Sequence, residues 1–579
     1  CNHCLVCMRR MVEAGSFDTD DVEAVRKYAL QNAIEYGGEG QSGSVLGRVL
    51  AERADLRPHA KKLLGLVESE VGRANSIAKK GGIEKVRMEL ESIDPSALER
   101  EKHRKKEGLR DLPGNTSEVI LRFAPNPNGP LSIGHSRGII INSRYAEMYG
   151  GKIVLRMDDT DTRVKPPLIE AYKWIVEDFE WLCGRSADTV IRASERMPIY
   201  LDYAERMISN KKGYVCRCTA EKFREYRELK IGCPCREKGV EESLDGWIAM
   251  KTGLMKEGDA VVRVKTDMGL PNPALRDWPA LRIQHTPHPI VGDKYKVWPL
   301  LDFQSAIEDH EQGITHIIRG KDLMDSTRKQ TLLYEHFGWK YPETLYWGRV
   351  KIHEFGGFST SGISSSIGSG EYSGWSDPRL PTLRALRRRG FEAQSLVDLW
   401  EEIGLTQKDI SISMQTVESF NSKIIDKICE RRIFVSNPVS VEIRGKDVYE
   451  KAKLARHPDG CISGEREWEI ESPIFIQKSD KVNGKLRLKD FADIKIIDSV
   501  AEIESEERTD DRQIIHWLPE KMSKDARLQI PNGEEISEVV GMIEDFELKV
   551  GEVYQFERLG FARIDLIDDD VVKLIWLHG

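Results

Sequence analysis

The chain has 579 residues, of which 40% are hydrophobic and 31% charged, and a formal net charge of −8. This length predicts about four domains, and the acidic balance excludes a general attraction to polyanions, so any contact with nucleic acid needs local basic patches. No apolar run reaches the ~20 residues that a membrane helix needs, and the N-terminus lacks the charged-then-apolar pattern of a signal peptide, so we expect a cytoplasmic protein with no membrane partner.

Residues 1–115 predict a helical N-terminal extension. Apolar residues recur at helical spacing among charged ones, as at Val22, Val25 and Ala29. A charged run is then followed by Pro113-Gly114, which ends any helix because proline removes a backbone donor and glycine frees the backbone. We therefore predict a domain boundary at residues 115–116.

Residues 116–212 have the pattern of the first half of a parallel α/β sheet. Residues 119–123 predict a short buried strand, residues 136–149 a helix, and residues 152–157 a second strand. Strand, loop, helix, strand is the unit of a Rossmann-type sheet. The loop between the first strand and the helix is rich in proline, asparagine and glycine.

That loop runs from Arg122 to His135 with the sequence RFAPNPNGPLSIGH. It opens a helix, whose free N–H groups and partial positive charge suit a phosphate. Gly134 allows close approach of the backbone, and His135 can donate to a phosphate oxygen. A turn with a surface histidine would explain an isolated Gly-His pair, but the whole string resembles the signature of class I aminoacyl-tRNA synthetases of the glutamyl/glutaminyl subgroup.

The resemblance runs from about residue 117 to the end and implies an archaeal-type glutamyl-tRNA synthetase. It implies a catalytic role for His135 and for Ser132, which replaces the motif's usual first histidine and can donate a hydrogen bond but carries no charge. The residues that it implies for ATP binding are Ala124, Pro125, Asn126, Gly134 and His135.

Three further residues are implied for the amino acid. Asp158, after the second strand, corresponds to the family's acid for the substrate ammonium, although acids in such a turn can also cap the next helix. Arg122 is implied to hold the amino acid as well. Arg319 follows a strand-like run at residues 314–318, and the family's arginine here binds the side-chain carboxylate of glutamate. A structural salt bridge of Arg319 to Asp309 or Asp322 is the alternative.

The resemblance places the loop that closes on ATP at residues 357–361, with Ser359, Thr360 and Ser361 as catalytic residues. Class I enzymes usually carry lysine there, yet no Lys or Arg occurs between Lys351 and Arg379. A Ser/Gly-rich stretch is more simply a flexible linker. Its position before the family-specific string at residues 374–382 identifies it as the loop.

Two groups of cysteines stand out among the ten. Cys216, Cys218, Cys233 and Cys235 form two close pairs, which match tetrahedral Zn²⁺ ligation and favour structural zinc over free thiols. The family carries a zinc-bearing, acceptor-end-binding insert here, at residues 213–290. The second group, Cys1, Cys4 and Cys7, lies at the N-terminus.

The resemblance implies the remaining domains, which are the second Rossmann half at 291–350, the ATP loop with a helical connecting domain at 351–430, and anticodon-binding β-barrels at 431–579. Short alternating runs in the last part predict the barrels, and Asn483-Gly484 predicts a hairpin. The basic run predicted to contact tRNA comprises Arg384, Arg387, Arg388 and Arg389, for which a solvated helix face is the alternative.

The fold class expected is therefore multidomain α/β, and the reaction implied is attachment of glutamate to tRNA(Glu) through glutamyl-adenylate. The cofactors implied are Mg²⁺ with ATP and structural Zn²⁺. A second acceptor, tRNA(Gln), stays open, and charging it would call for a tRNA-dependent amidotransferase as partner. The alternatives are a glutaminyl-tRNA synthetase, a tRNA-binding homologue with impaired activation, and an enzyme that glutamylates a tRNA base.

Overall fold

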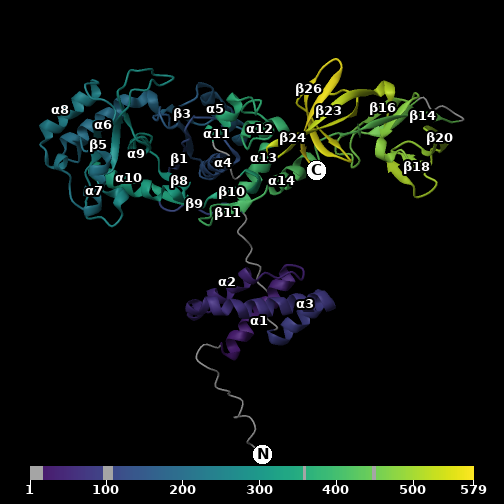
Figure 1. Ribbon diagram of the computed structural model, residues 1–579, viewed down its shortest axis with the longest axis horizontal. Coiled ribbons are helices and arrows are strands. Elements are labelled where there is room, and N and C mark those ends of the chain that lie inside the picture. Colours follow the sequence, from purple (N-terminus) through teal and green to yellow (C-terminus); the bar gives the residue numbers. More distant parts are fainter. Residues whose placement is uncertain (1–16, 95–107, 356–359, 446–450) are drawn as a thin grey trace, which may run out of the picture. The chain divides into compact units, whose positions relative to one another are not determined.

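The computed structural model describes residues 17–94, 108–355, 360–445 and 451–579 (Figure 1). The chain divides into two compact units, Cys1–Lys106 and Glu107–Gly579. Among the described residues, none of the helices combines the length and apolarity that crossing a membrane requires.

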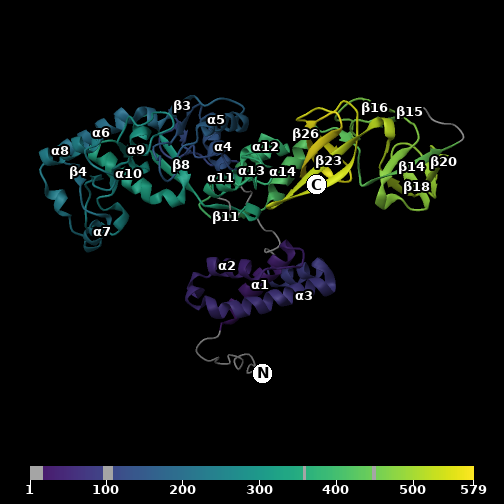
Figure 2. The ribbon, with the colours of Figure 1, turned by 45° about the horizontal axis from the view of Figure 1, so that its top comes forward.

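The first unit is helical. Its helices are α1 (Thr19–Glu35), α2 (Ser42–Glu52) and α3 (Ala60–Ile93), with a 3-10 turn at Ala54–His59. Asp18 caps α1 by accepting from the backbone N–H of Asp21, and the Asp21 side chain accepts from the backbone N–H of Asp18. These two bonds satisfy two donors at the start of the helix. The three helices pack against one another (Figure 2), and Val25, Val45 and Val67 lie in the core between them.

The sheet of the catalytic domain is parallel and comes from segments far apart in sequence. Strands β1 (Ile120–Phe123), β2 (Lys152–Met157) and β3 (Thr189–Arg192) pair in that order, and β8 (His316–Gly320) pairs with β9 (Glu343–Trp347). The Thr315 backbone N–H donates to the Ile120 carbonyl at 3.0 Å, which joins the two halves beside β1. The covering helices are α4 (Ile133–Met148), α5 (Ile169–Cys183), α9 (Leu301–Glu311) and α10 (Met324–Phe337).

One predicted strand is displaced. The strand predicted at residues 314–318 is found at His316–Gly320 (β8). Arg319 therefore lies inside the strand rather than beyond its end. The register explains this shift, because Arg319 pairs with Tyr346 and Gly320 with Trp347 of β9.

Between the two halves lies an α+β module. Its antiparallel sheet comprises β4 (Gly213–Cys216), β5 (Val261–Val264), β6 (Pro279–Ile283) and β7 (Val297–Pro299). Its helices are α6 (Met197–Ser209), α7 (Ala220–Leu229) and α8 (Val240–Lys251). Trp247, Trp278 and Trp298 are buried in its core.

A small connecting region follows. It comprises β10 (Val350–Ile352), α11 (Thr360–Gly368), α12 (Leu383–Arg389), α13 (Ala393–Ile403), β11 (Ile410–Ile412) and α14 (Met414–Ile425). The Ser/Gly-rich stretch, expected to be a loop, is helical from Thr360. Ile363 and Ile367, one helical turn apart, pack against Tyr372 and Leu380, and this apolar stripe outweighs the weak helix propensity of serine and glycine.

Two seven-stranded sheets form the C-terminal part (Figure 1). The first runs in the order β12 (Arg431–Arg432), β25 (Val553–Phe556), β26 (Gly560–Ile567), β27 (Val571–His578), β23 (Ser523–Asn532), β24 (Glu535–Glu544) and β13 (Phe434–Ser436). The second runs β21 (Gln513–Ile515), β18 (Gly484–Leu488), β19 (Asp493–Ile497), β20 (Val500–Ser505), β14 (Pro438–Arg444), β17 (Ile474–Gln477) and β22 (Trp517–Pro519). Strands β15 (Lys451–Ala455) and β16 (Glu465–Glu469) pair with each other.

The hairpin predicted at Asn483-Gly484 is wrong. Strand β18 pairs with β19 and β21, whereas β17 pairs with β14 and β22. A 3-10 turn at Lys478–Asp480 intervenes, and Asp480 in it is ion-paired with Arg558, in the turn between β25 and β26. The chain therefore leaves β17 before it reaches the Asn-Gly turn.

Candidate active site

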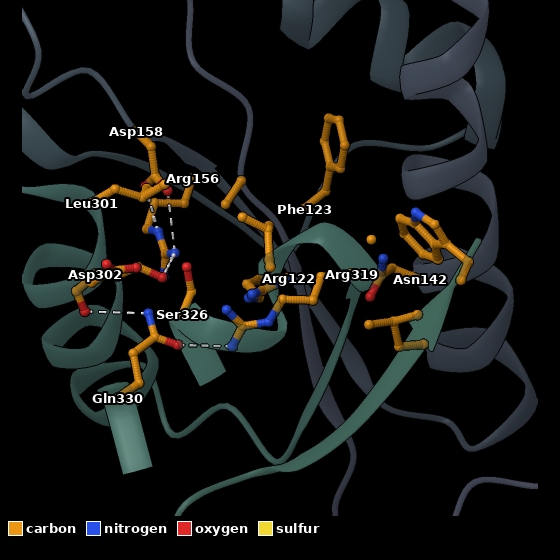
Figure 3. A pocket seen from close by; sticks show the side chains of 16 residues that line it. Arg122, Phe123, Asn142, Arg156, Asp158, Leu301, Asp302, Arg319, Ser326 and Gln330 are labelled. Atoms are coloured by element: carbon orange, nitrogen blue, oxygen red, sulfur yellow. Dashed lines mark hydrogen bonds and ion pairs between the residues drawn. The ribbon is translucent and has the colours of Figure 1, made fainter. Parts of the chain in front are cut away.

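A cavity lies where the carboxyl ends of β1, β2 and β8 meet, which is the usual place for ligands in parallel sheets (Figure 3). Its lining residues are Arg122, Phe123, Ala124, Asn142, Arg156, Asp158, Leu301, Asp302, Ser305, Ile318, Arg319, Gly320, Leu323, Ser326, Gln330 and Trp347. The cavity thus brings together Arg122, Asp158 and Arg319, the three residues predicted to hold an amino acid.

Charge in the cavity is unbalanced. Three buried guanidinium groups, of Arg122, Arg156 and Arg319, meet two buried carboxylates, of Asp158 and Asp309. The carboxylate of Asp302, which also lines the cavity, is paired with Lys329 Nζ at 2.7 Å and therefore adds no net charge. Asp309 accepts from Arg156 Nη1 at 2.7 Å and from Arg122 Nε at 3.3 Å, and the nearby arginines hold its pKa below the usual value despite its burial. One positive charge is therefore in excess, which suits a ligand with net negative charge.

Arg319 has no carboxylate partner among the described residues. Its Nη2 donates to the Gln330 Oε1 atom at 2.8 Å and to the Tyr341 hydroxyl at 2.6 Å, which are both neutral groups. Its Nε is buried without a hydrogen bond. The structural salt bridge considered as an alternative is thus not formed with either Asp309 or Asp322, and the guanidinium is free for a ligand carboxylate.

Asp158 is already held from two sides. Its carboxylate accepts from Arg156 Nε at 2.7 Å and from Gln304 Nε2 at 2.9 Å. Arg156 was not predicted from the sequence. It lies near the end of β2, and Asp158, just after the strand, is two positions further on, the spacing that places extended residues on the same side of a sheet. The arrangement fixes an anionic oxygen at the cavity wall, where an ammonium group can bind.

The predicted phosphate-binding loop begins α4. Ser132 is its N-cap, and its backbone N–H donates to His135 Nδ1 at 3.1 Å. An Nδ1 that accepts from an amide carries no proton, so the proton lies on Nε2, which can donate to a ligand. The surrounding protein and the charge of Lys165 both lower the pKa of His135, which favours this neutral form.

The other residues predicted for ATP have different positions. Ala124 lines the cavity, whereas Pro125 and Asn126 brace the segment after β2: the Pro125 carbonyl accepts from the Asp158 N–H, and Asn126 Nδ2 donates to the Asp158 carbonyl. The Asn126 Oδ1 atom is buried without a partner. Gly134 is exposed on the first turn of α4.

The start of α11 lies against the same loop. A Cβ on Gly129 would come within 2.7 Å of the Thr360 methyl group, so only glycine allows this contact. Thr360 and Ser361 are the first residues of α11, and Ser359 lies outside the described residues. The expected position of this segment beside the phosphate-binding loop is thus consistent with the contact, although its form is helical.

The four paired cysteines converge at one point of the inserted module. Their Sγ atoms all lie within 4.8 Å of one another, and the pairs Cys216–Cys233 and Cys218–Cys235 are 3.9 and 3.8 Å apart. Metal–sulfur bonds of about 2.3 Å in a tetrahedron separate the sulfurs by about 3.8 Å. The donor set and spacing therefore fit a metal ion. Cys1, Cys4 and Cys7 lie outside the described residues.

Comparison with known proteins gives the family. Residues 118–427, more than half of the chain, match the catalytic domain of the class I tRNA synthetases (E and Q), and residues 429–511 match the anticodon-binding domain of the same group. The chain belongs to this family.

Curated relatives of this synthetase are similar over almost their whole length. The glutamate–tRNA ligase of Methanosarcina mazei is 44% identical, over 96% of this chain and 99% of its own. That of Archaeoglobus fulgidus is 45% identical over 95% and 99%, and that of Pyrococcus abyssi 42% over 95% and 98%. The archaeal-type resemblance is thereby confirmed.

The basic run of the synthetase forms α12. Arg384 and Arg387 pair with Glu177 and Asp178 of α5 at 3.0 and 3.4 Å, and their guanidinium groups lie over tryptophan rings. Both remain partly exposed.

The other two arginines of α12 contact the first C-terminal sheet. Arg388 forms two hydrogen bonds to Asp565 of β26, and its side chain is 30% exposed. Arg389 is only 6% exposed and donates to the Leu577 carbonyl of β27 at 2.6 Å. We therefore assign Arg389 a structural role, while Arg384, Arg387 and Arg388 line a surface cavity with Arg563, which the sequence reasoning missed.

Proposed function

We propose that this synthetase attaches glutamate to tRNA(Glu). The observation that carries the proposal is the excess positive charge of the cavity, with Arg319 held only by neutral groups. Glutamate brings one net negative charge and a side-chain carboxylate for Arg319, whereas glutamine would leave the buried guanidinium unpaired. The names of the relatives agree, since each is a glutamate–tRNA ligase.

The reaction has two steps. An oxygen of the α-carboxylate of glutamate forms a bond to the α-phosphorus of ATP. The bond between this phosphorus and the oxygen that bridges to the β-phosphorus breaks, and pyrophosphate leaves. A ribose hydroxyl of the terminal tRNA adenosine then attacks the carbonyl carbon, and AMP leaves. Mg²⁺, bound with ATP, neutralises phosphate charge.

The chain's residues position these groups. Asp158 binds the substrate ammonium, Arg319 the side-chain carboxylate, and Arg122 offers Nη1 and Nη2, which have no partner among the described residues. His135 donates Nε2–H to a phosphate, beside Ser132 and the free N–H groups around Gly134. Thr360 and Ser361, with Ser359, would complete the phosphate site from the α11 side. The protein thus mainly aligns charges.

Structural zinc is part of the proposal. Cys216, Cys218, Cys233 and Cys235 would hold it, and the Arg217 N–H donates to Cys235 Sγ at 3.4 Å, a contact that stabilises a thiolate. Zinc there would tie β4 to the turn at Pro234–Glu237. In the proposed division of the chain, this region is the acceptor-end-binding insert, residues 213–290.

The tRNA would also contact two further parts of the second unit. Arg384, Arg387 and Arg388 are proposed to contact its backbone phosphates, and residues 431–579 to bind the anticodon. Because these partners occur in the cytoplasm, we expect the enzyme to act there. Charging of tRNA(Gln), with a tRNA-dependent amidotransferase to complete the product, is the extension that the experiment below decides.

Aminoacylation with glutamate or glutamine on tRNA(Glu) or tRNA(Gln) tests the proposal. We expect glutamyl-tRNA(Glu) and no glutaminyl-tRNA. Product with glutamine would establish the glutaminyl alternative, and binding of tRNA without any product would establish a tRNA-binding homologue that no longer activates an amino acid. Glutamyl-tRNA(Gln) would add the second acceptor.

A further inference from the structure

The side-chain amide of Gln330, in α10, is buried, and both its oxygen and its nitrogen have hydrogen-bond partners. Its Oε1 accepts from Arg319 Nη2 at 2.8 Å and from the Tyr341 hydroxyl at 2.6 Å, and its Nε2 donates to the Asp302 carbonyl at 3.2 Å. Figure 3 shows it between Asp302 and Arg319. Two donors face Oε1 and a carbonyl faces Nε2, so the network admits one orientation of the amide.

Tyr341 completes this support from β9's side of the sheet. Its hydroxyl accepts from Arg319 Nη2 at 2.6 Å and gives its own proton to Gln330. Burial raises the pKa of Tyr341 to about 12, so the phenol keeps its proton at neutral pH. Both groups that orient Arg319 are therefore uncharged.

A neutral support has a consequence for the substrate. A carboxylate in the place of the Gln330 amide would hold the guanidinium as firmly but would cancel its charge. Asp309 is shared between Arg122 and Arg156, so the surplus charge of the cavity resides on Arg319. A neutral amide keeps that surplus available to the ligand.

We propose that Gln330, supported by Tyr341, is a positioning residue that fixes Arg319 while leaving its charge uncompensated, and thereby makes the cavity select a side-chain carboxylate over an amide. The inference rests on the proposed glutamate activity and names the part of the site that discriminates the substrate.

Two substitutions separate orientation from charge. Gln330→Met removes the acceptor at similar size, and Gln330→Glu keeps the acceptor but adds a negative charge. For Gln330→Met we expect the KM for glutamate to rise roughly tenfold, the scale of one hydrogen bond to a charged group, with kcat and the KM for ATP little changed. For Gln330→Glu we expect kcat/KM for glutamate to fall at least about 100-fold, while the inhibition constant of glutamine stays the same.

Gln407→Glu, on an exposed loop, is the matched control for an added charge. An unchanged KM for glutamate in both Gln330 variants, or equal losses for glutamate, glutamine and ATP, would overturn the inference. If Gln330→Glu loses its cooperative melting transition, Gln330→Met and Tyr341→Phe decide, because both keep the charge of the cavity.

The unmodified protein provides the separate test of the proposed function in the same assay. If it charges tRNA with glutamate while the Gln330 variants match it, the inference alone fails. If it forms no glutamyl-tRNA, the proposed function fails.

Discussion

A guanidinium buried without a carboxylate is costly unless a ligand supplies the missing charge. The three arginines of the cavity differ in this respect. Arg156 is paired with Asp158 and Asp309, Arg122 contacts Asp309 through Nε alone, and Arg319 contacts only neutral groups. The site therefore places its one unpaired cation at the position predicted to face the side chain of glutamate.

Replacing Arg319 should act on glutamate and not on ATP. For Arg319→Ala, kcat/KM for glutamate should fall by roughly two to four orders of magnitude, because the substrate carboxylate loses its charged partner in a water-poor site. The KM for ATP should change little. Steady-state kinetics with each substrate varied in turn measures both, and a matching loss for both ligands would show that Arg319 is structural.

At this scale the sequence identifies the ligand-facing residues but not the residues that hold them. Arg122, Asp158 and Arg319 lie in family strings and are found together in one cavity. Gln330 and Tyr341 lie in no such string and reach Arg319 only because α10 and β9 fold back on β8. Such contacts depend on tertiary packing, which spacing along one chain does not encode.

Helix α11 is the element whose form the sequence did not predict, because serine and glycine favour loops and only Ile363 and Ile367 mark a buried face. It carries no Lys or Arg, so the proposed phosphate site lacks the family's usual cation there. Gly362→Lys should raise kcat by roughly tenfold or more with little change in the KM for glutamate, since one stabilised phosphate charge is worth about 2–4 kcal/mol.

Gly368→Lys, at the other end of α11, is the control for the added charge and for the higher helix propensity of lysine. Should neither variant change kcat, another cation already acts on the phosphates. Lys165, whose charge acts on His135, is the first residue to replace in that case.

The cysteine site can be tested as a single element. Purified protein should contain about one zinc per chain, and replacing Cys216, Cys218, Cys233 and Cys235 together by serine should abolish it, because thiolates are the ligands that zinc prefers. Elemental analysis by mass spectrometry measures the content. Cys461→Ser, at an exposed cysteine outside the cluster, should keep the metal. Zinc retained in the quadruple variant would place the site elsewhere.

At the scale of the whole second unit, ion pairs join the two C-terminal sheets. Glu557, after β25, accepts from Lys489 Nζ at 2.9 Å and lies 3.4 Å from His516 Nε2, both in the second sheet's region. The hydrogen bond from His516, with that from Lys489, lowers the pKa of Glu557 to about 2. The resulting stability is present above the unfolded-state pKa of 4.5 and is lost as the pH falls from there toward 2.

Glu557→Gln should therefore lower the free energy of unfolding by about 1–3 kcal/mol at pH 7, and the difference from the unmodified protein should shrink below pH 4.5. Urea unfolding at pH 7.0, 5.5 and 3.5 measures it. Glu538→Gln, in an exposed pair with Arg527, should change stability by less than about 1 kcal/mol at each pH. A difference that is constant with pH would contradict the ionic role of Glu557.

The first strands and the helix between them are largely predictable from the sequence, whereas the order of strands within the sheets is not. The strands predicted at residues 119–123 and 152–157 are found at Ile120–Phe123 and Lys152–Met157, and the helix predicted at residues 136–149 runs from Ile133 to Met148. Strand β12 instead pairs with β25, more than a hundred residues later, and the Asn-Gly turn joins no hairpin. Turn residues report local geometry, but sheet order is decided by packing between distant segments.

Helix α12 contacts the catalytic domain at its start and the first C-terminal sheet at its end. At its start the Leu383 N–H donates to the Leu131 carbonyl, and the Ile133 N–H donates to Pro381, beside the N-cap of α4. At its end Arg388 donates to Asp565 of β26, and Arg389 donates to the Leu577 carbonyl of β27. Seven helical residues span only about 10 Å. One short helix thus connects the first C-terminal sheet directly to the segment that begins α4, the helix that carries His135.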